Sequence, residues 1–281
     1  MTDIYRFILA LCVVQGHFLA SGAPWLAWQA VFSFYVLSGF LVTLVLNQQY
    51  GASLPGLTRF AVNRRLRLFP ICYVVIGLTV LYIAFVGPLN SLNGALTLPV
   101  GTRAMIANLL IINLPGFNTA QMTPERLSPT AWSLGIELCF YFLLAIYFAK
   151  SRSRLLVMLA VGIAVTGWEI VAAFDTSTYG FLDRYAVIES GIIPFALGGL
   201  AYWFRESRLY EFSALKILLF VALFAANVAA GFWSEFHRYV SGLYIAAALN
   251  FFLVPVLFRR PAIAEWQKVL GGLSYPVFLS H

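Results

Sequence analysis

Side chains suited to acid–base chemistry and anion binding occur inside stretches of this sequence that are otherwise apolar. Arg6 and His17 lie in the run YRFILALCVVQGHF, and Glu137 lies in the run WSLGIELCFY. An imidazole and a carboxylate are frequent partners in general acid–base catalysis. Ionisable groups within membrane spans are costly and usually face a cavity. We therefore treat these three residues as candidates for function.

The spacing of these residues predicts how helices would present them. Arg6 and His17 are eleven residues apart, which is about 1100° of helix rotation, so they share one face at a separation of about 16 Å. Ser133, Glu137 and Tyr141 follow one another at intervals of four residues and also share a face. Counted inward from opposite ends of their helices, Glu137 and His17 reach a similar depth. The spacing therefore predicts a carboxylate and an imidazole in one chamber.

Other apolar and basic runs contain further candidates for a polar cavity. The runs FSFYVLSGFLVT, NRRLRLFP and LGGLSYPVFLSH contain Ser38, Arg64, Arg67, Tyr275 and His281. The two arginines are three residues apart and face one way on a helix, where guanidinium groups can clamp phosphates. We expect the span that follows these arginines to begin near residue 68, which would place Pro70 in its first turn. His281 would lie about 18 Å above the start of its run, near the depth of His17.

Each of these residues also has a purely structural explanation. The three arginines would serve as cytoplasmic anchors of the spans, and either histidine could form a hydrogen bond between helices. The small pair Ser38 and Gly39 would allow two helices to pack closely. Glu137 could instead pair with Arg126 or Arg184 near the outer surface.

The composition indicates which elements must position these residues. Of the 281 residues, 61% are hydrophobic and only 10% are charged, whereas soluble domains have about a quarter charged residues. Backbone polar groups in lipid are satisfied within helices, and apolar runs of about 20 residues can cross a bilayer. Such runs occur near residues 4–21, 25–46, 68–87, 131–149, 155–174, 186–204, 214–233, 239–258 and 269–281.

These runs predict an all-α, polytopic transmembrane bundle of about nine spans, which forms one domain over residues 1–281. The apolar piece 104–114 is too short to span and is expected in the membrane interface. The last run begins near Val269 and stops at His281, so we expect the domain to continue past this end.

The basic residues predict the orientation of the chain. The net charge is +7. With the N-terminus in the cytoplasm, fourteen of the 18 Lys and Arg residues fall on the cytoplasmic side, as the positive-inside rule requires. The basic charge is thereby explained by orientation in a lipid bilayer, and we expect no nucleic-acid partner.

The three cysteines are expected to be packing residues. Cys12, Cys72 and Cys139 all lie inside expected spans. No pair of them has the spacing of metal ligands, and an odd buried set does not form a disulfide framework. We therefore expect no metal site.

Taken in order, these motifs resemble the acyltransferase type 3 family, the polytopic membrane O-acyltransferases that modify sugars and cell-envelope polymers. The resemblance covers essentially the whole chain. It rests on Asp3, Arg6 and His17, then FYVLSGFLV, Arg64-x-x-Arg67-x-x-Pro70, WSLGIE and LSYPVFLSH. Relatives often have a second Glu directly after the first, where this chain has Leu138. The family fold usually has about ten spans, which agrees with the expected continuation.

The resemblance implies O-acetylation: an acyl group, most commonly acetyl from cytoplasmic acetyl-CoA, moves to a hydroxyl of an extracytoplasmic carbohydrate or glycolipid. Succinyl is the other acyl group that we consider. Such an enzyme would be a multi-pass protein of the bacterial inner membrane that modifies polysaccharides.

The family motifs also imply roles for the candidate residues. Arg6, Arg64 and Arg67 would hold the phosphates of the acyl donor. His17, assisted by Glu137, would be either the general base or a carrier of the acyl group. Further residues expected to line the cavity are Ser38, Ser133, Tyr141, Tyr275 and His281.

The main alternative from another functional class is a transporter or flippase of a lipid-linked or small sugar. Buried ionisable residues also form proton relays and substrate pathways. Transporters, however, often contain inverted repeats and paired broken spans, and we find no such symmetry in the sequence. A structural or receptor-like protein would not need a carboxylate and an imidazole at one depth.

Overall fold

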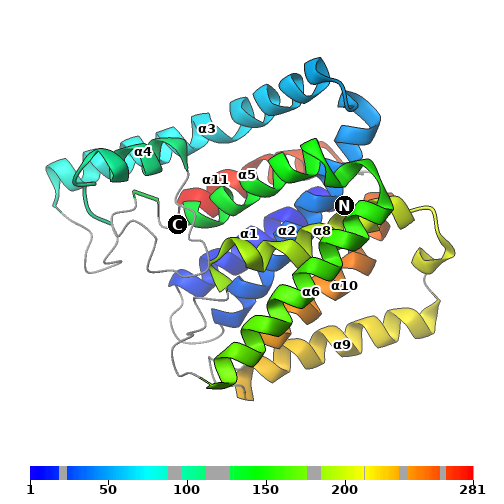
Figure 1. Ribbon diagram of the computed structural model, residues 1–281. Helices are drawn as coiled ribbons and strands as arrows, with labels where there is room; N and C mark the ends of the chain where they lie inside the picture. Colours follow the sequence, from blue (N-terminus) through cyan, green and yellow to red (C-terminus); the bar gives the residue numbers. More distant parts are fainter. Residues whose placement is uncertain are drawn as a thin grey trace.

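The computed structural model describes residues 1–18, 24–87, 96–111, 127–128, 130–175, 185–211, 213–233, 240–259 and 264–280. These residues form helices and no strands, which confirms the predicted all-α class (Figure 1). Every run expected to span coincides with a helix: α1 (Thr2–Phe18), α2 (Pro24–Val45), α3 (Leu54–Phe85), α5 (Ala131–Ile146), α6 (Arg152–Asp175), α8 (Ile192–Phe204), α9 (Ala214–Trp233), α10 (Val240–Arg259) and α11 (Glu265–Ser280).

Several of these helices have the dimensions of membrane spans. Within the described residues, five are long and apolar enough to cross a membrane, namely Pro24–Tyr50, Leu54–Phe85, Arg152–Val171, Ala214–Phe232 and Ser241–Arg259. Shorter apolar helices cover Ala131–Ile146 and Ile188–Phe204. These features indicate an integral membrane protein. The total number of spans and the cytoplasmic N-terminus stay predictions.

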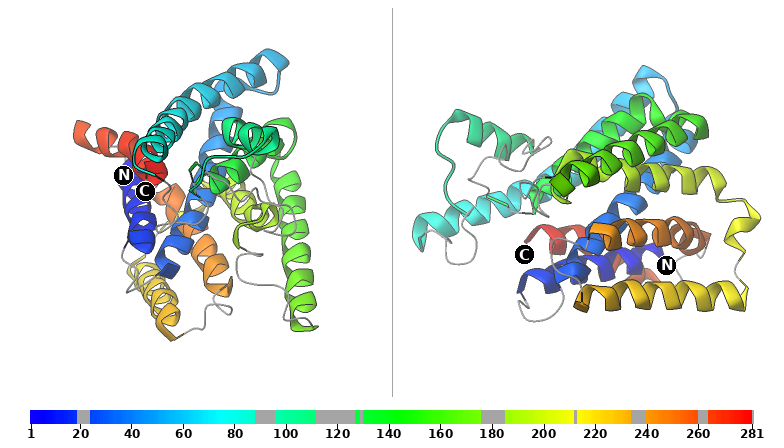
Figure 2. Two further views of the ribbon diagram at one scale, coloured as in Figure 1. Left: turned by 90° about the vertical axis from the view of Figure 1, so that its left-hand side faces the viewer. Right: turned by 60° about the horizontal axis from the view of Figure 1, so that its bottom comes forward.

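Helix α2 lies at the centre of the bundle. It packs against α1, α5, α8 and α10, and α3 and α9 lie on opposite sides of it (Figures 1 and 2). The most apolar window of α2 is 78% buried, whereas that of α9 is only 11% buried. Helix α2 is therefore the scaffold that orients residues from its neighbours, and α9 presents most of its surface outward.

Small residues allow α2 and α8 to touch along their backbones. A Cβ added to Gly198 would lie 2.1 Å from the carbonyl oxygen of Val36 and 3.0 Å from the Cα of Gly39. A Cβ added to Gly39 would lie 2.5 Å from the carbonyl oxygen of Phe195. This confirms close helix packing for Gly39, and it fixes the position of Ser38 beside it.

Helix α3 begins earlier than predicted. Its N-cap is Ser53, whose Oγ accepts a hydrogen bond from the backbone N–H of Gly56 at 3.3 Å, and Pro55 lies in the first turn. Ser and Pro are favourable at these positions. The expected start near residue 68 is therefore wrong, and Pro70 lies in the helix interior. The following short helix, α4 (Thr102–Leu110), has nine residues, and it cannot span a bilayer.

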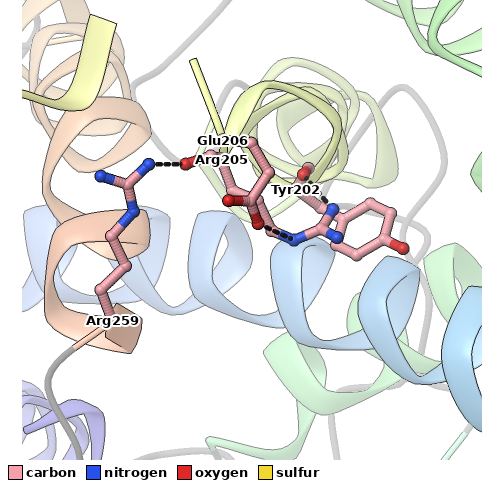
Figure 3. A network of polar contacts seen from close by, with 4 residues as sticks. All are labelled: Tyr202, Arg205, Glu206 and Arg259. Atoms are coloured by element: carbon pink, nitrogen blue, oxygen red, sulfur yellow. Dashed lines mark hydrogen bonds and ion pairs between the residues drawn. The ribbon is translucent and has the colours of Figure 1, made fainter. Parts of the chain in front are cut away.

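The end of α8 is tied to the end of α10 by a cluster of polar contacts (Figure 3). The Arg205 guanidinium lies 4.2 Å from the centre of the Tyr202 ring and donates a hydrogen bond to the Tyr202 carbonyl at 2.8 Å. Arg259 donates to the carbonyl oxygen of Arg205. An ion pair of 3.3 Å joins Arg205 to the exposed Glu206. These contacts hold together the two helices that pack against α2.

Candidate active site

A cavity of about 80 Å³, open to water-sized molecules, lies where α1, α2, α3, α5 and α11 meet. A single water molecule needs about 10–15 Å³ of such space, so the cavity is large enough for part of a bound molecule. Its walls combine apolar side chains, such as Leu37, Leu41 and Phe278, with polar ones. The polar members of the lining are Arg6, Tyr35, Ser38, Arg64, Arg67, Ser133, Glu137, Tyr141, Ser274 and Tyr275.

The cavity brings together most of the predicted site residues, although their roles stay predictions. Eight of them line it: Arg6, Ser38, Arg64, Arg67, Ser133, Glu137, Tyr141 and Tyr275. His17 lies in the last turn of α1, and its side chain is outside what the structure describes. His281 is outside the described residues altogether.

Glu137 is held on one of its two carboxylate oxygens. Ser38 on α2 and Tyr141, one turn further along α5, both donate hydrogen bonds through their hydroxyls to Oε1. No described residue donates a hydrogen bond to Oε2. The carboxylate therefore has a fixed orientation and one free acceptor atom at a cavity wall. The alternative pairing with Arg126 or Arg184 falls on residues outside the described part of the chain.

Unlike Tyr141, Ser133 does not donate a hydrogen bond to Glu137. Its Oγ donates to the carbonyl oxygen of Thr130 at 2.9 Å, at the start of α5. Ser133, Glu137 and Tyr141 nevertheless all line the cavity, as their four-residue spacing requires.

The three candidate arginines line the same cavity as Glu137. Arg64 lies with its guanidinium carbon 5.2 Å from the centre of the Tyr141 ring and 5.4 Å from that of Phe60. Arg6 interacts electrostatically with Arg67 and Glu137. Among the described residues none of the three guanidinium groups forms an ion pair with a carboxylate. Clustered cations that form no close ion pair are suited to binding an anion.

Helix α11 closes the cavity against α1 and α3. The Tyr275 hydroxyl donates to the carbonyl oxygen of Leu68 on α3 at 2.9 Å. On the other side, the side chain of Asp3 fills the space in front of Gly271, where a Cβ would lie 2.3 Å from Oδ1. Only glycine at this position leaves room for that carboxylate beside α11.

The structure does not place Glu137 and His17 at the same depth, contrary to the prediction. Gly16, next to His17, lies against Ala27, because a Cβ added to Gly16 would be 2.4 Å from the Ala27 Cβ. The partner of Glu137 on α2 is Ser38, which is eleven residues after Ala27, or about 16 Å along the helix. Glu137 is therefore about three helical turns from the end of α1 that contains His17. Glu137 is instead level with the Arg6 half of α1.

Sequence reasoning missed Tyr35 as a cavity residue. It lines the cavity, three residues before Ser38 on the same face of α2. Its ring stacks on Phe195 at 5.2 Å, and its buried hydroxyl has no hydrogen-bond partner among the described residues. The three-residue interval to Ser38 was the signal that could have identified it.

Comparison with known proteins identifies the family of this chain. Nodulation protein 10 of Rhizobium leguminosarum bv. viciae is 29% identical over 276 residues, which covers 88% of this chain and 69% of that protein. No solved structure gives a significant match. A family model described as an acyltransferase domain matches residues 2–281. Because this match covers nearly the whole chain, the protein belongs to the acyltransferase family that its motifs resemble, and it is a membrane acyltransferase.

Proposed function

We propose that this enzyme moves an acyl group, foremost acetyl, from cytoplasmic acyl-CoA to a hydroxyl of an extracytoplasmic carbohydrate or glycolipid in the bacterial inner membrane. The observation that supports this proposal is the cavity, in which three guanidinium groups without an ion-pair partner in the described part of the chain adjoin a fixed carboxylate and apolar walls. A transporter or flippase is disfavoured, because the family match is to an enzyme.

The arginines would bind the head of the acyl donor. Coenzyme A carries its phosphates on a nucleotide head and its thioester at the tip of a long, thin pantetheine arm. Arg64, Arg67 and Arg6 can bind phosphates through charge-assisted hydrogen bonds, which guanidinium groups often form in a bidentate manner. Arg67 is exposed and Arg6 is half-buried, so a molecule that binds both extends from the protein surface into the bundle.

His17 would carry out the chemistry about 16 Å further along α1 than Arg6. As a general base, its imidazole takes the proton of the acceptor hydroxyl while the acceptor oxygen bonds to the carbonyl carbon of the thioester. The carbon–sulfur bond breaks, and coenzyme A leaves as the thiol after taking up that proton. Alternatively His17 attacks the thioester and carries the group as an acyl-imidazole, which gives ping-pong kinetics. The apolar walls would protect the thioester from water.

Transfer of labelled acetyl groups tests this function. Membranes that contain the wild-type protein should transfer label from acetyl-CoA to envelope carbohydrates, and mass spectrometry should detect the added acetyl mass. His17→Ala should lower the rate by about 100-fold or more, which is the usual contribution of a general base. A His17→Ala protein that folds normally and retains the full rate would refute the assignment.

A further inference from the structure

Because Glu137 lies far from His17 along α2, it does not directly assist His17, which is the role that the sequence suggested for it. Glu137 shares the cavity with Arg6, and Arg6 lies eleven residues before His17 on α1. A donor with its phosphates at Arg64 and the exposed Arg67 and its thioester near His17 must therefore extend past Arg6 and Glu137. The segment of the donor that lies there is the pantetheine arm.

We propose that Glu137 binds the pantetheine arm of the acyl donor as a hydrogen-bond acceptor, and that Ser38 and Tyr141 hold the carboxylate in position for this contact. This inference rests on the proposed use of acyl-CoA. The arm is uncharged and carries amide N–H groups and a hydroxyl, which are donors that a carboxylate oxygen accepts.

The hydrogen bonds of Glu137 support an acceptor role. Both protein donors reach Oε1, while Oε2 has no donor among the described residues. A carboxylate has about four acceptor positions, so Oε2 can still bind donors from a ligand. Ser38 cannot move away easily, because its neighbour Gly39 lies against the backbone of α8.

The charges around the cavity distinguish the arm from the head of the donor. A carboxylate repels phosphate, so the phosphates would lie with the exposed Arg67 and with Arg64, which rests on the Tyr141 ring. The hydroxyl of Tyr141 points to Glu137 while its ring supports Arg64. One side chain thus lies between the binding site for the head and the binding site for the arm.

Equilibrium binding of two probes tests the inference without relying on turnover. The probes are coenzyme A and phosphoadenosine diphosphate, which is its head without the arm, and the protein is purified in lipid nanodiscs. Glu137→Ala should weaken binding of coenzyme A about 10-fold or more, as expected for a charge-assisted hydrogen bond. It should leave the affinity for phosphoadenosine diphosphate unchanged. Arg64→Ala with Arg67→Ala should weaken binding of both probes.

Variants of the two supporting residues refine the test. Ser38→Ala and Tyr141→Phe should each weaken coenzyme A binding several-fold and leave binding of the head unchanged. The ring that supports Arg64 is retained in Tyr141→Phe. Tyr5→Phe is a matched control, because it also removes a hydroxyl that donates to another side chain, here Asn250. It lies outside the cavity lining and should bind both probes like the wild type.

The outcomes separate this inference from the proposed function. If the wild type binds coenzyme A and Glu137→Ala binds it equally well, the inference is overturned and the proposed function stands. The inference also fails if Glu137→Gln binds coenzyme A normally but loses turnover, since Glu137 would then act on a proton. A correctly folded wild type that binds no coenzyme A would overturn the acyl-CoA donor itself.

Discussion

Two polar clusters lie inside this bundle, and they differ in how completely their groups are paired. In the first, which we name the closed cluster, Tyr5 donates to Asn250 Oδ1, and Asn250 Nδ2 donates to Ser33 Oγ at 2.9 Å and to the Ala246 carbonyl at 2.8 Å. Ser33 Oγ then donates to the Gln29 carbonyl at 2.7 Å. This chain of hydrogen bonds joins α1, α2 and α10.

The second, the open cluster, consists of Ser38, Glu137 and Tyr141 with the three arginines. It also joins neighbouring helices, but one carboxylate oxygen and three guanidinium groups have no hydrogen-bond or ion-pair partner among the described residues. Arg67 is exposed and its charge is met by water, but Glu137 and Arg6 are half-buried. Polar groups withdrawn from water are normally paired, and unpaired ones are costly unless a ligand or water satisfies them. From this comparison we propose that the closed cluster stabilises the fold and that the open cluster binds a ligand.

The largest expected effect is the loss of donor binding in the open cluster. Arg64→Ala with Arg67→Ala should raise the KM for acyl-CoA about 100-fold, because two charge-assisted hydrogen bonds contribute about 1.5–3 kcal/mol each and are not fully additive. Steady-state kinetics with varied donor measures this change. The KM for the acceptor should stay within about two-fold; an equal rise for both substrates would show that the arginines serve only to anchor α3.

The sequence predicted which residues form the open cluster, but it did not predict the depth of Glu137 relative to His17. Helix geometry fixes the positions of Ser133, Glu137 and Tyr141 on one face. The axial offset between two helices depends on tilt and packing, which the sequence does not show. The predicted depth match between Glu137 and His17 failed for this reason.

The sequence also did not predict how deeply each helix is buried or where α3 begins. Mean hydropathy is 1.9 for α2 and 2.1 for α9, although their buried shares are 78% and 11%. Lipid and protein neighbours are equally apolar, so hydropathy does not distinguish them. Pro70 was expected near a helix start because proline disfavours helix interiors, yet the N-cap of α3 is Ser53, 17 residues before Pro70.

A smaller effect is expected from breaking the closed cluster. Asn250→Ala removes the side chain that links Tyr5 to Ser33 and leaves buried hydroxyl groups without that partner, so it should lower the free energy of unfolding by about 1–3 kcal/mol. Thermal unfolding in detergent measures the change. The kcat per folded protein should stay within about two-fold of the wild type. A stable Asn250→Ala protein with a strongly reduced kcat would reverse the assignment of the two clusters.

The smallest effect is expected at the exposed ion pair that follows α8. Glu206 is exposed and pairs with Arg205, and exposed ion pairs contribute at most about 1 kcal/mol. Glu206→Gln should therefore change the unfolding free energy by less than about 0.5 kcal/mol and leave activity unchanged. A loss of several kcal/mol in the same unfolding assay would show that this exposed ion pair, rather than the closed cluster, stabilises the bundle.

The most direct test of the account is a structure of the protein with coenzyme A bound, determined in a lipid nanodisc. The account predicts phosphates at Arg64 and Arg67, the pantetheine arm beside Glu137, and the sulfur directed toward His17. Coenzyme A bound at another surface, or a cavity filled by a lipid chain while coenzyme A is present, would contradict it.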